Sequence, residues 1–343
     1  MKALVLSHIT DEYLTAIERV CDVVKAGACK GEPALNEQEV DDTIRTNDPE
    51  ILIVDSTPIT EKNLKHANSL KIVICTRGNP INVNKHILDE RGIPLTHTPA
   101  RNANGVAEFT VGLVLACIRK IPQADKAVRN GTVTLDASED SIKQDQTDVI
   151  WYHPELNVVP YEEFKGKELC SLTLGLVGVG AVGRLVAEKM NLLGVKVIAY
   201  DPYISEASAN QLPIEFCTLE QLAAKSDVVS IHAKATSENQ YMIDKKFFKA
   251  MKNGAVLINS SRGSLLNTQD LIEALKNRDV ECAALDVFEY EPLSVHDELL
   301  SLPNVILTPH ISGASTDVAV HHSQMAWKSL EAFINGDTVP FKM

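Results

Sequence analysis

Short apolar runs alternate with amphipathic stretches along most of this chain of 343 residues. In the first hundred residues the apolar runs predict five β-strands, with the sequences KALVLSH, DVVKAG, ILIVDS, KIVICT and IPLTHT. The stretches between them have the periodicity of helices with one apolar face. Strands and helices that alternate in this way are typical of a parallel sheet covered by helices on both faces. The first hundred residues are therefore predicted to form a doubly wound α/β domain.

The alternation resumes in the second half of the chain. Seven apolar runs predict strands there: SLTLGLVG, VKVIAYD, PIEFC, DVVSIHA, AVLINSS, ECAALDVF and NVILTPH. Before them, residues 102–131 have the pattern of one long helix, and a polar segment predicts an extended arm at about 130–163. An amphipathic stretch at residues 315–336 predicts a last helix, which we expect to pack on the first domain. The predicted fold class is α/β, with two doubly wound parallel-sheet domains.

A glycine-rich turn follows the predicted strand SLTLGLVG and precedes a helical stretch. Gly178, Gly180 and Gly183 form the pattern G-x-G-x-x-G at this turn. Such glycines permit a close approach of the backbone to a pyrophosphate, which then faces the N-terminus of the helix. The next strand ends in Asp201, whose carboxylate can accept hydrogen bonds from the adenosine ribose. Because no arginine follows to meet a 2′-phosphate, the pattern predicts NAD rather than NADP as the cofactor.

Three other predicted strands end in side chains that suit chemistry on a small acid. Arg262 follows AVLINSS, and His310 closes NVILTPH. Between them, Asp286 lies at the strand end in ECAALDVF, and Glu291 follows that run. The carboxyl ends of parallel strands meet a ligand at one edge of the sheet. A guanidinium can clamp a carboxylate, and an imidazolium supported by a carboxylate can donate a proton to a carbonyl oxygen as hydride reaches the carbon. These residues predict hydride transfer to a 2-keto acid.

Composition and charge narrow the class of protein. The formal net charge of −13 argues against nucleic acid or an anionic membrane surface as the main partner. The seven cysteines are scattered without a C-x-x-C pair, which favours reduced thiols in a cytoplasmic protein over disulfides or a zinc site. We expect no bound metal. No window approaches the roughly 20 apolar residues that span a bilayer, and the N-terminal run predicts a strand rather than a signal peptide.

The segments that carry these residues resemble the D-isomer-specific 2-hydroxyacid dehydrogenase family, over nearly the whole chain. NSSRG is similar to the family's arginine segment, LDVFEYEP to its glutamate segment and LPNVILTPHISG to its histidine segment. The resemblance implies that Arg262 binds the substrate carboxylate, that Glu291 supports the histidine and that His310 is the acid/base. It further implies NAD-dependent interconversion of a small D-2-hydroxy acid and its 2-keto acid, in a homodimer formed through the long helix.

The resemblance also extends to the domains and to the cofactor site. It implies a Rossmann NAD-binding domain at residues 100–312, inserted in a flavodoxin-like substrate domain made of residues 1–99 and 313–343. The residues expected to bind the cofactor are Gly178, Gly180, Ala181, Val182, Gly183, Asp201, His232, Ser260, Ser261, Arg262, Asp286, His310 and Gly313. Among them, Asp286 resembles the family aspartate that meets the nicotinamide carboxamide.

Two segments depart from the family pattern. The family's glycine loop, whose amides help to bind the substrate carboxylate, is matched here by TRGNPIN. In this loop Gly78 and Asn79 are expected to keep the amide role. Arg77 adds a cation, which is either a substrate-binding group or a solvated or paired surface residue. Lys234 stands where the family usually has proline, and it alters the expected shape of a cofactor loop.

Two alternative functions stay open at this point. Transcriptional corepressors that sense NAD(H) share this fold and can keep the same arginine, glutamate and histidine, although no basic region is visible in this chain. Formate or phosphite oxidation is the other alternative. Formate dehydrogenases typically pair the histidine with glutamine, so Glu291 argues against formate. The leading prediction is an NAD-dependent D-2-hydroxyacid dehydrogenase.

Overall fold

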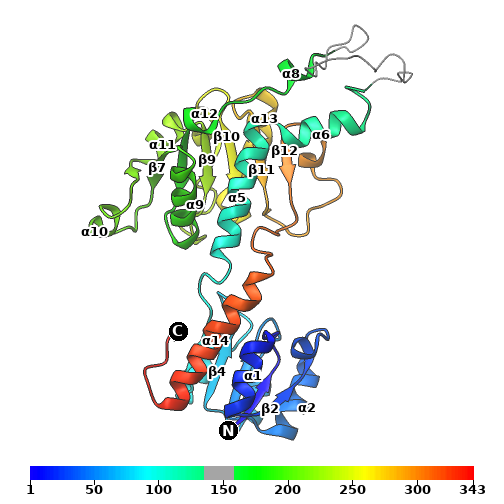
Figure 1. Ribbon diagram of the computed structural model, residues 1–343, viewed down its shortest axis with the longest axis vertical. Helices are drawn as coiled ribbons and strands as arrows, with labels where there is room; N and C mark the ends of the chain where they lie inside the picture. The colour runs from blue at the N-terminus through cyan, green and yellow to red at the C-terminus, as the bar shows by residue number, and fades with distance from the viewer. Residues whose placement is uncertain (135–157) are drawn as a thin grey trace, which may run out of the picture. The chain divides into compact units, whose positions relative to one another are not determined.

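The computed structural model describes residues 1–134 and 158–343, and the chain divides into two compact units (Figure 1). Unit 1 consists of Met1–Asn102 and Ala314–Met343, and unit 2 of Ala103–Gly313. The divisions expected from the sequence, at 99/100 and 312/313, lie close to these points. Each unit is built on one parallel sheet, so the predicted fold class of two doubly wound α/β domains is confirmed.

The sheet of unit 1 has five parallel strands in the order β2-β1-β3-β4-β5. They are β1 (Lys2–Val5), β2 (Asp22–Lys25), β3 (Ile51–Val54), β4 (Ile72–Cys75) and β5 (Leu95–Thr96), each inside one of the five predicted runs. The chain goes from β1 outward to β2 and then returns past β1 to β3. The strand order therefore reverses between β1 and β3. Such a switch point leaves a crevice beyond the carboxyl ends of the two strands, where open α/β sheets bind ligands.

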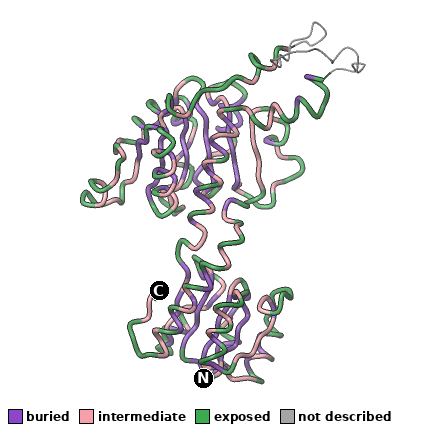
Figure 2. Tube along the Cα trace, in the orientation of Figure 1, coloured by how far each residue is buried: buried purple, intermediate pink, exposed green. Residues whose placement is uncertain are grey.

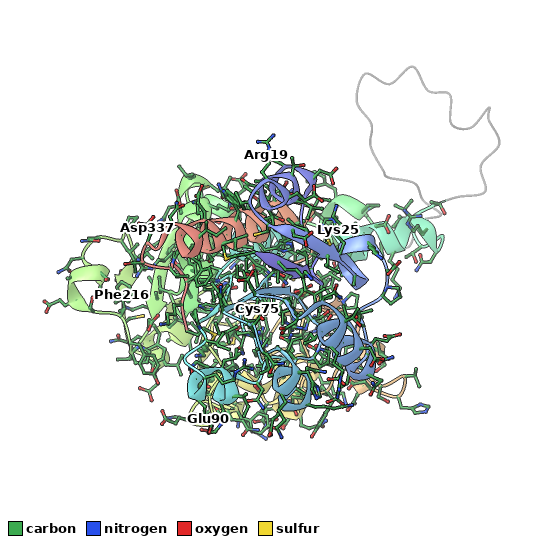
Figure 3. All side chains as sticks on the ribbon, turned by 90° about the horizontal axis from the view of Figure 1, so that it is seen from below. Arg19, Lys25, Cys75, Glu90, Phe216 and Asp337 are labelled. Atoms are coloured by element: carbon green, nitrogen blue, oxygen red, sulfur yellow. The ribbon has the colours of Figure 1, made fainter. Side chains whose placement is uncertain are left out.

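Helices pack on both faces of this sheet. They are α1 (Asp11–Val20), α2 (Glu37–Asn47), α3 (Glu61–His66), α4 (Lys85–Glu90) and α14 (Asp317–Asn335), with a 3-10 turn η1 (Gly27–Lys30). Ala326 and Leu330 of α14 share one buried cluster with Ala3 and Val5 of β1, which confirms that the last helix packs on the first domain. Strands β3 and β4 are buried along their whole length and are drawn in purple in Figure 2. Cys75, at the end of β4, is fully buried; it is labelled in Figure 3.

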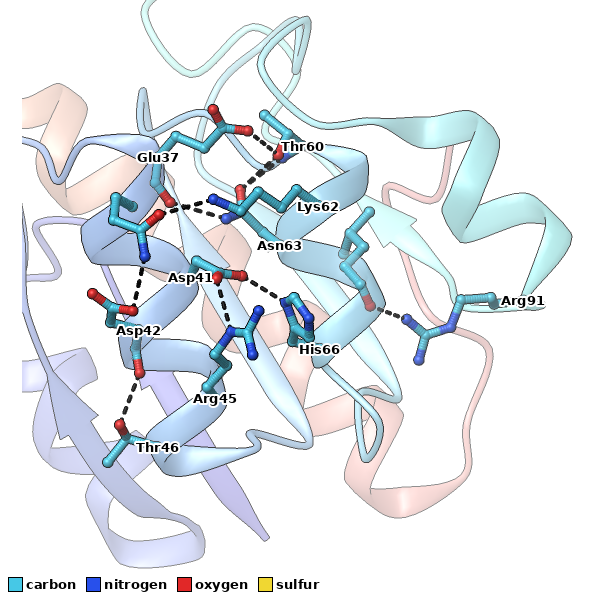
Figure 4. Close-up of polar contacts among 12 residues, drawn as sticks. Glu37, Asp41, Asp42, Arg45, Thr46, Thr60, Lys62, Asn63, His66 and Arg91 are labelled. Carbon is cyan, nitrogen blue, oxygen red and sulfur yellow. Dashed lines mark hydrogen bonds and ion pairs between the residues drawn. The ribbon is translucent and has the colours of Figure 1, made fainter.

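A group of polar contacts joins α2 to α3 in unit 1 (Figure 4). The buried carboxylate of Asp41 accepts a hydrogen bond from Arg45 Nε at 2.8 Å and pairs with His66 Nδ1 at 2.7 Å. Burial by itself raises the pKa of Asp41, but these two partners outweigh burial and hold the pKa below its usual value. The carboxylate is therefore charged at neutral pH and ties the two helices together.

The sheet of unit 2 has seven parallel strands in the order β12-β11-β10-β9-β6-β7-β8. They are β6 (Thr173–Val177), β7 (Lys196–Tyr200), β8 (Glu215–Phe216), β9 (Val228–Ile231), β10 (Val256–Asn259), β11 (Cys282–Leu285) and β12 (Val305–Leu307). All seven lie inside the predicted runs. The order reverses between β6 and β9, so the carboxyl ends of these two strands flank the switch point of this unit.

The helices of unit 2 differ from the sequence prediction at one place. They are α5 (Ala103–Ile118), α6 (Ile121–Arg129), α8 (Pro160–Glu163), α9 (Ala181–Leu192), α10 (Glu206–Ala209), α11 (Leu219–Lys225), α12 (Lys245–Ala250) and α13 (Thr268–Asn277), with 3-10 turns η2 (Leu169–Ser171), η3 (Gly263–Leu265) and η4 (Glu298–Ser301). The prediction of one helix over residues 102–131 is wrong, because α5 ends before α6 begins. Lys120 between them is left-handed, with φ of 51°, and Pro122 has no N–H to continue the helical hydrogen bonds.

Most of the arm predicted at residues 130–163 lies outside the described residues. The described end of this range, residues 158–163, includes the short helix α8. Within residues 1–134 and 158–343, no helix is both long and apolar enough to cross a membrane.

Candidate active site

The glycine pattern forms the turn between β6 and α9. Gly178 has φ of 97°, and a Cβ at this position would lie 2.7 Å from the backbone nitrogen of Ala233, so only glycine fits. A Cβ at Gly180 would meet no atom within 4 Å. The backbone at Gly180 therefore borders open space, at the N-terminus of a helix of 12 residues. The free N–H groups of the first helical turn fit a pyrophosphate at this point.

Asp201 follows β7 and ties that strand to the glycine turn. Its Oδ2 accepts a hydrogen bond from Val179 N–H at 2.8 Å, and its Oδ1 accepts one from Tyr203 N–H at 3.0 Å. Each carboxylate oxygen has a second lone pair. Asp201 can thus brace the turn and still accept a hydrogen bond from a ribose hydroxyl, and it fits a dinucleotide at this position.

His232 follows β9 and lies against the same turn. A Cβ at Gly183 would be 3.6 Å from the His232 Cβ. Nε2 of His232 lies 2.9 Å from Ser230 Oγ, and burial lowers the pKa of His232 to about 4. The imidazole is therefore neutral at neutral pH. It fills the space beside the glycine turn without adding a charge there.

Ser260 and Ser261 follow β10, and both hydroxyls bond to other protein groups. Ser260 Oγ lies 2.8 Å from Thr110 Oγ1 of α5, and Ser261 Oγ donates to the carbonyl of Ala233 at 2.7 Å. These bonds hold the end of β10 to α5 and to the segment after β9. The two serines thus brace this edge of the sheet, while their expected contact with the cofactor stays a prediction.

Arg262 is exposed at the end of β10, on a backbone that is fixed by its neighbours. The Asn259 side-chain amide donates to the carbonyl of Arg262 at 3.0 Å. The next residue, Gly263, lies against Phe288, where a Cβ at position 263 would be 2.0 Å from the Phe288 carbonyl carbon. Only glycine permits this approach. The Arg–Gly pair therefore brings the Arg262 loop next to the segment that carries Glu291.

His310 follows β12 in a turn that Asp286 holds in place. The backbone of His310 is left-handed, with φ of 55°, which few residues other than glycine adopt. The His310 N–H donates to the Asp286 carbonyl at 2.8 Å. The buried Asp286 carboxylate accepts from Ile311 N–H at 2.9 Å and from Ser312 N–H at 2.8 Å. It also accepts from the Thr308 hydroxyl at 2.6 Å. Asp286 therefore fixes the turn after β12, and with it the position of the His310 side chain.

His310 and Glu291 are in direct contact, with His310 Nδ1 2.7 Å from Glu291 Oε2. The other carboxylate oxygen, Oε1, accepts from Phe288 N–H at 3.0 Å. Burial by itself raises the pKa of Glu291, but His310, the Phe288 N–H and the Arg262 charge outweigh it, so the pKa lies below its usual value. An ionised Glu291 can only accept, so Nδ1 of His310 is the donor. The other ring nitrogen, Nε2, is left for proton exchange.

In unit 1, the predicted substrate loop follows β4. The carbonyl of Arg77 accepts from Thr98 N–H at 2.9 Å, and His97 Nδ1 lies 2.9 Å from the Gly78 carbonyl. These bonds fix the loop on one side. Within the two described ranges, the backbone N–H groups of Gly78 and Asn79 have no hydrogen-bond partner in the protein. Both are therefore available to an anion.

A nucleotide turn, an exposed arginine and a histidine–glutamate pair on one sheet are the features expected from the sequence. Residues 111–312 match the model of the D-isomer specific 2-hydroxyacid dehydrogenase, NAD binding domain. The chain belongs to the D-isomer specific 2-hydroxyacid dehydrogenase family. It is accordingly an NAD-binding oxidoreductase of the 2-hydroxyacid dehydrogenase type.

Relatives in this dehydrogenase family cover nearly the whole chain. The chain is 34% identical to the glyoxylate reductase of Thermofilum pendens over 340 residues, which are 99% of this chain and 93% of that enzyme. It is 31% identical to the D-3-phosphoglycerate dehydrogenase of Methanocaldococcus jannaschii over 321 residues, which are 93% of this chain and 54% of that protein.

Solved structures of the family share the fold of this dehydrogenase. The D-mandelate dehydrogenase of Rhodotorula graminis has a TM-score of 0.80 at 23% identity, over 100% of this chain and 97% of that one. The D-lactate dehydrogenase of Lactobacillus jensenii, solved with NAD+, has a TM-score of 0.77 at 22% identity, over 100% of this chain and 99% of that one.

The remaining predicted residues of the dehydrogenase lie at the ends of elements. Ala181 and Val182 begin α9, and Gly313 is the last residue of unit 2. In the loop after β9, the Lys234 carbonyl accepts from the Asn239 amide at 2.8 Å, so the loop is braced without the proline that the family usually has.

Several residues that hold the site together were not indicated by the sequence. Phe288 supplies the N–H that orients Glu291, Thr110 fixes the end of β10, and Thr308 bonds to Asp286. Backbone amides and single hydroxyls inside apolar segments form no recognisable spacing. No motif could have found them.

Proposed function

We propose that this chain interconverts a small D-2-hydroxy acid and its 2-keto acid, with NAD as hydride carrier and His310 as the acid/base. The observation that carries the proposal is the contact of 2.7 Å between His310 Nδ1 and Glu291 Oε2. Because this contact keeps a proton on Nδ1, the nitrogen that exchanges a proton with the substrate is Nε2. Half of the His310 side chain is accessible, with 47% exposed, so a substrate can reach it.

When bound, NAD supplies the hydride acceptor or donor. In the direction of reduction, the Arg262 guanidinium binds the substrate carboxylate and orients the carbonyl. The imidazolium of His310 donates its Nε2 proton to the carbonyl oxygen, which becomes the hydroxyl. Glu291 stays ionised, because its pKa is lowered, and it stabilises the imidazolium before the transfer. In the direction of oxidation, neutral His310 accepts the hydroxyl proton at Nε2.

The proposed substrate class is a small 2-hydroxy or 2-keto acid. Relatives named glyoxylate reductase and D-3-phosphoglycerate dehydrogenase support this class. In unit 1 we propose that the N–H groups of Gly78 and Asn79 bind the same carboxylate, as the glycine loop of the family does. The loop is already held by His97 and Thr98, so little ordering is required on binding.

A panel of 2-keto acids tests the proposal through the oxidation of NADH. Glyoxylate, pyruvate, hydroxypyruvate and 3-phosphohydroxypyruvate are suitable members. The His310→Asn variant should lose about 10²–10⁴-fold in kcat, the range expected for an acid/base group. Its affinity for NADH should change little, because the glycine turn and Asp201 lie elsewhere on the sheet.

The matched control is His86→Asn, since the His86 side chain is 79% exposed on α4 of unit 1. It should retain full activity. A His310→Asn variant with nearly normal kcat would reject His310 as the proton donor. Tight binding of NADH without turnover of any keto acid would favour the alternative of an NAD(H)-sensing protein.

A further inference from the structure

Arg101 lies beside the switch point of the unit 1 sheet, where the strand order reverses between β1 and β3. Its Nη2 is 3.7 Å from Oδ1 of Asp55, the residue that follows β3. The Arg101 Nη1 is 2.8 Å from Nδ1 of His322 on α14. The other ring nitrogen of His322, Nε2, is 2.8 Å from the carbonyl of His8, which follows β1. Arg101 is thus connected to the segments that follow both strands. This is the position at which open α/β sheets bind ligands.

The contacts of His322 define its tautomer. The His8 carbonyl can only accept, so Nε2 of His322 carries the proton. The Arg101 guanidinium can only donate, so Nδ1 has the free lone pair. Burial lowers the pKa of His322, which is 6% exposed, and the charge of Arg101 lowers it further. A neutral His322 therefore orients Arg101 without cancelling its charge.

The groups around Arg101 leave an excess of positive charge. Arg77, after β4, lies beside the segment that leads to Arg101, because its carbonyl accepts from Thr98 N–H at 2.9 Å. Burial is the largest cause of the lowered pKa of Arg101, and the charge of Arg77 lowers that pKa further. Among the charged groups that affect the pKa of Arg101, Asp55 is the carboxylate whose negative charge opposes the two guanidinium charges. Its distance of 3.7 Å from Arg101 exceeds the about 2.7–2.9 Å of a charge-assisted hydrogen bond. Arg101 therefore keeps N–H donors that Asp55 does not occupy.

We propose that Arg101 and Arg77 form a second anion-binding site, which recognises an anionic group of the substrate other than its 2-carboxylate. This inference rests on the proposed function and narrows its substrate class. It assigns the protein 2-hydroxy and 2-keto acids that carry a second anion, either a phosphate or a distal carboxylate. Arg101 determines this specificity, and His322 and Asp55 are positioning residues.

Matched pairs of keto acids test the site directly. Hydroxypyruvate and 3-phosphohydroxypyruvate differ by a phosphate, and 2-oxopentanoate and 2-oxoglutarate differ by a distal carboxylate. In the unaltered enzyme, one dianionic member should have a kcat/KM at least about tenfold above that of its monoanionic partner. A preference within the first pair identifies a phosphate as the bound group, and a preference within the second pair identifies a distal carboxylate.

The Arg101→Met variant should raise KM for the preferred dianion by about 10–100-fold, the range of a hydrogen bond to a charged group. Its kcat for the dianion should fall much less, and KM for the monoanion should change far less than KM for the dianion. The Arg77→Met variant should show the same pattern. Arg129→Met is the matched control, because the Arg129 side chain is 77% exposed on α6, and its KM values should be unchanged.

The positioning role of His322 has its own readout. His322→Leu removes the acceptor for Arg101, and it should raise KM for the dianion while kcat changes less. His322→Gln can still accept from Arg101 and donate to the His8 carbonyl, so it should restore much of the affinity. Equal effects of His322→Leu on the dianion and the monoanion would show a structural role alone.

Two results would overturn the second anion site. One is an unaltered enzyme that does not prefer a dianion in either pair. The other is an Arg101→Met variant whose KM rises equally for both members of a pair.

If no keto acid is turned over, the proposed function fails, and inorganic phosphate then tests the anion site alone. At constant ionic strength, phosphate should raise the Tm of the unaltered chain, and Arg101→Met should remove that rise. The same measurement on Arg77→Met provides a second result if Arg101→Met does not fold. A phosphate effect that is absent from the unaltered chain, or is equal in all variants, would reject the site.

Discussion

Gly263 lies so close to Phe288 that a Cβ at position 263 would be 2.0 Å from the Phe288 carbonyl carbon. This approach connects the strand end that carries Arg262 to the loop that carries Glu291. The Phe288 N–H also donates to Glu291 Oε1 at 3.0 Å, so a displacement of Phe288 would release one oxygen of the carboxylate. The relative positions of Arg262 and Glu291 therefore depend on a position that must be glycine.

We expect Gly263→Ala to destabilise the protein by about 1–3 kcal/mol, the usual cost of overpacking. It should also lower kcat/KM for a keto acid, because the loop with Glu291 must move. Chemical denaturation and steady-state kinetics measure the two effects. Gly112→Ala is the control, since a Cβ at this position of α5 meets no atom within 4 Å. A Gly263→Ala variant with unchanged stability and activity would contradict the described contact.

Gly180→Ala should separate cofactor binding from stability. A Cβ at Gly180 meets no protein atom within 4 Å, so the free energy of unfolding should change by less than about 0.5 kcal/mol. The methyl group would occupy the open space that we assign to the pyrophosphate. The Kd for NADH should therefore rise by about tenfold or more, as calorimetric titration would measure. An unchanged Kd would place the pyrophosphate elsewhere.

Asp201 should determine the choice between NAD and NADP. Its carboxylate repels a 2′-phosphate, so kcat/KM should be higher with NADH than with NADPH. Asp201→Asn should narrow this difference while an oxygen still accepts from Val179 N–H, which holds the turn. Asp201→Ala loses that acceptor, and we expect it to weaken binding of both cofactors. Equal kcat/KM for NADH and NADPH in the unaltered enzyme would refute this role.

The pH dependence of reduction should report the contact between Glu291 and His310. The pKa of Glu291 is below its usual value, so the carboxylate is ionised throughout the neutral range and carries a negative charge 2.7 Å from His310 Nδ1. Reduction requires the proton on Nε2, and kcat/KM should therefore fall as the pH rises. In Glu291→Gln this fall should move to lower pH, since the charge is lost while the shape is kept. A pH profile that does not move would mean that another group donates the proton.

Stability should fall in acid partly because of His232. Its pKa is about 4 in the folded chain, compared with about 6.5 when unfolded. The unfolded chain therefore binds a proton between these values while the folded chain does not, so the free energy of unfolding decreases as the pH falls from 6.5 to 4. For a group with a shift of this size the loss is about 3 kcal/mol, since each unit of pKa difference corresponds to about 1.4 kcal/mol. His232→Asn should flatten this part of the curve of unfolding free energy against pH; an unchanged slope would exclude His232 as the cause.

The sequence by itself determined the sheets and the positions of the chemical groups. In the described residues all twelve strands lie inside the predicted runs. The central strands are mostly apolar and are buried along their length, because helices cover both of their faces. Arg262, Glu291 and His310 could be predicted as site residues for a related reason. Each comes after an apolar run of the sequence, and the carboxyl ends of parallel strands lie at one edge of a sheet. Local patterns are sufficient for such features.

Features that depend on two distant segments were decided only by the tertiary structure. The break at Lys120 was missed because apolar periodicity continues across a single left-handed residue. Asp286 follows a strand as a ligand-binding residue does, yet its carboxylate also bonds to Thr308, Ile311 and Ser312. The contact of Arg101 with His322 joins residues 221 positions apart. A hydrogen bond requires a defined distance and direction in space, but its two partners have no fixed separation along the sequence. Only the folded chain therefore reveals such partners.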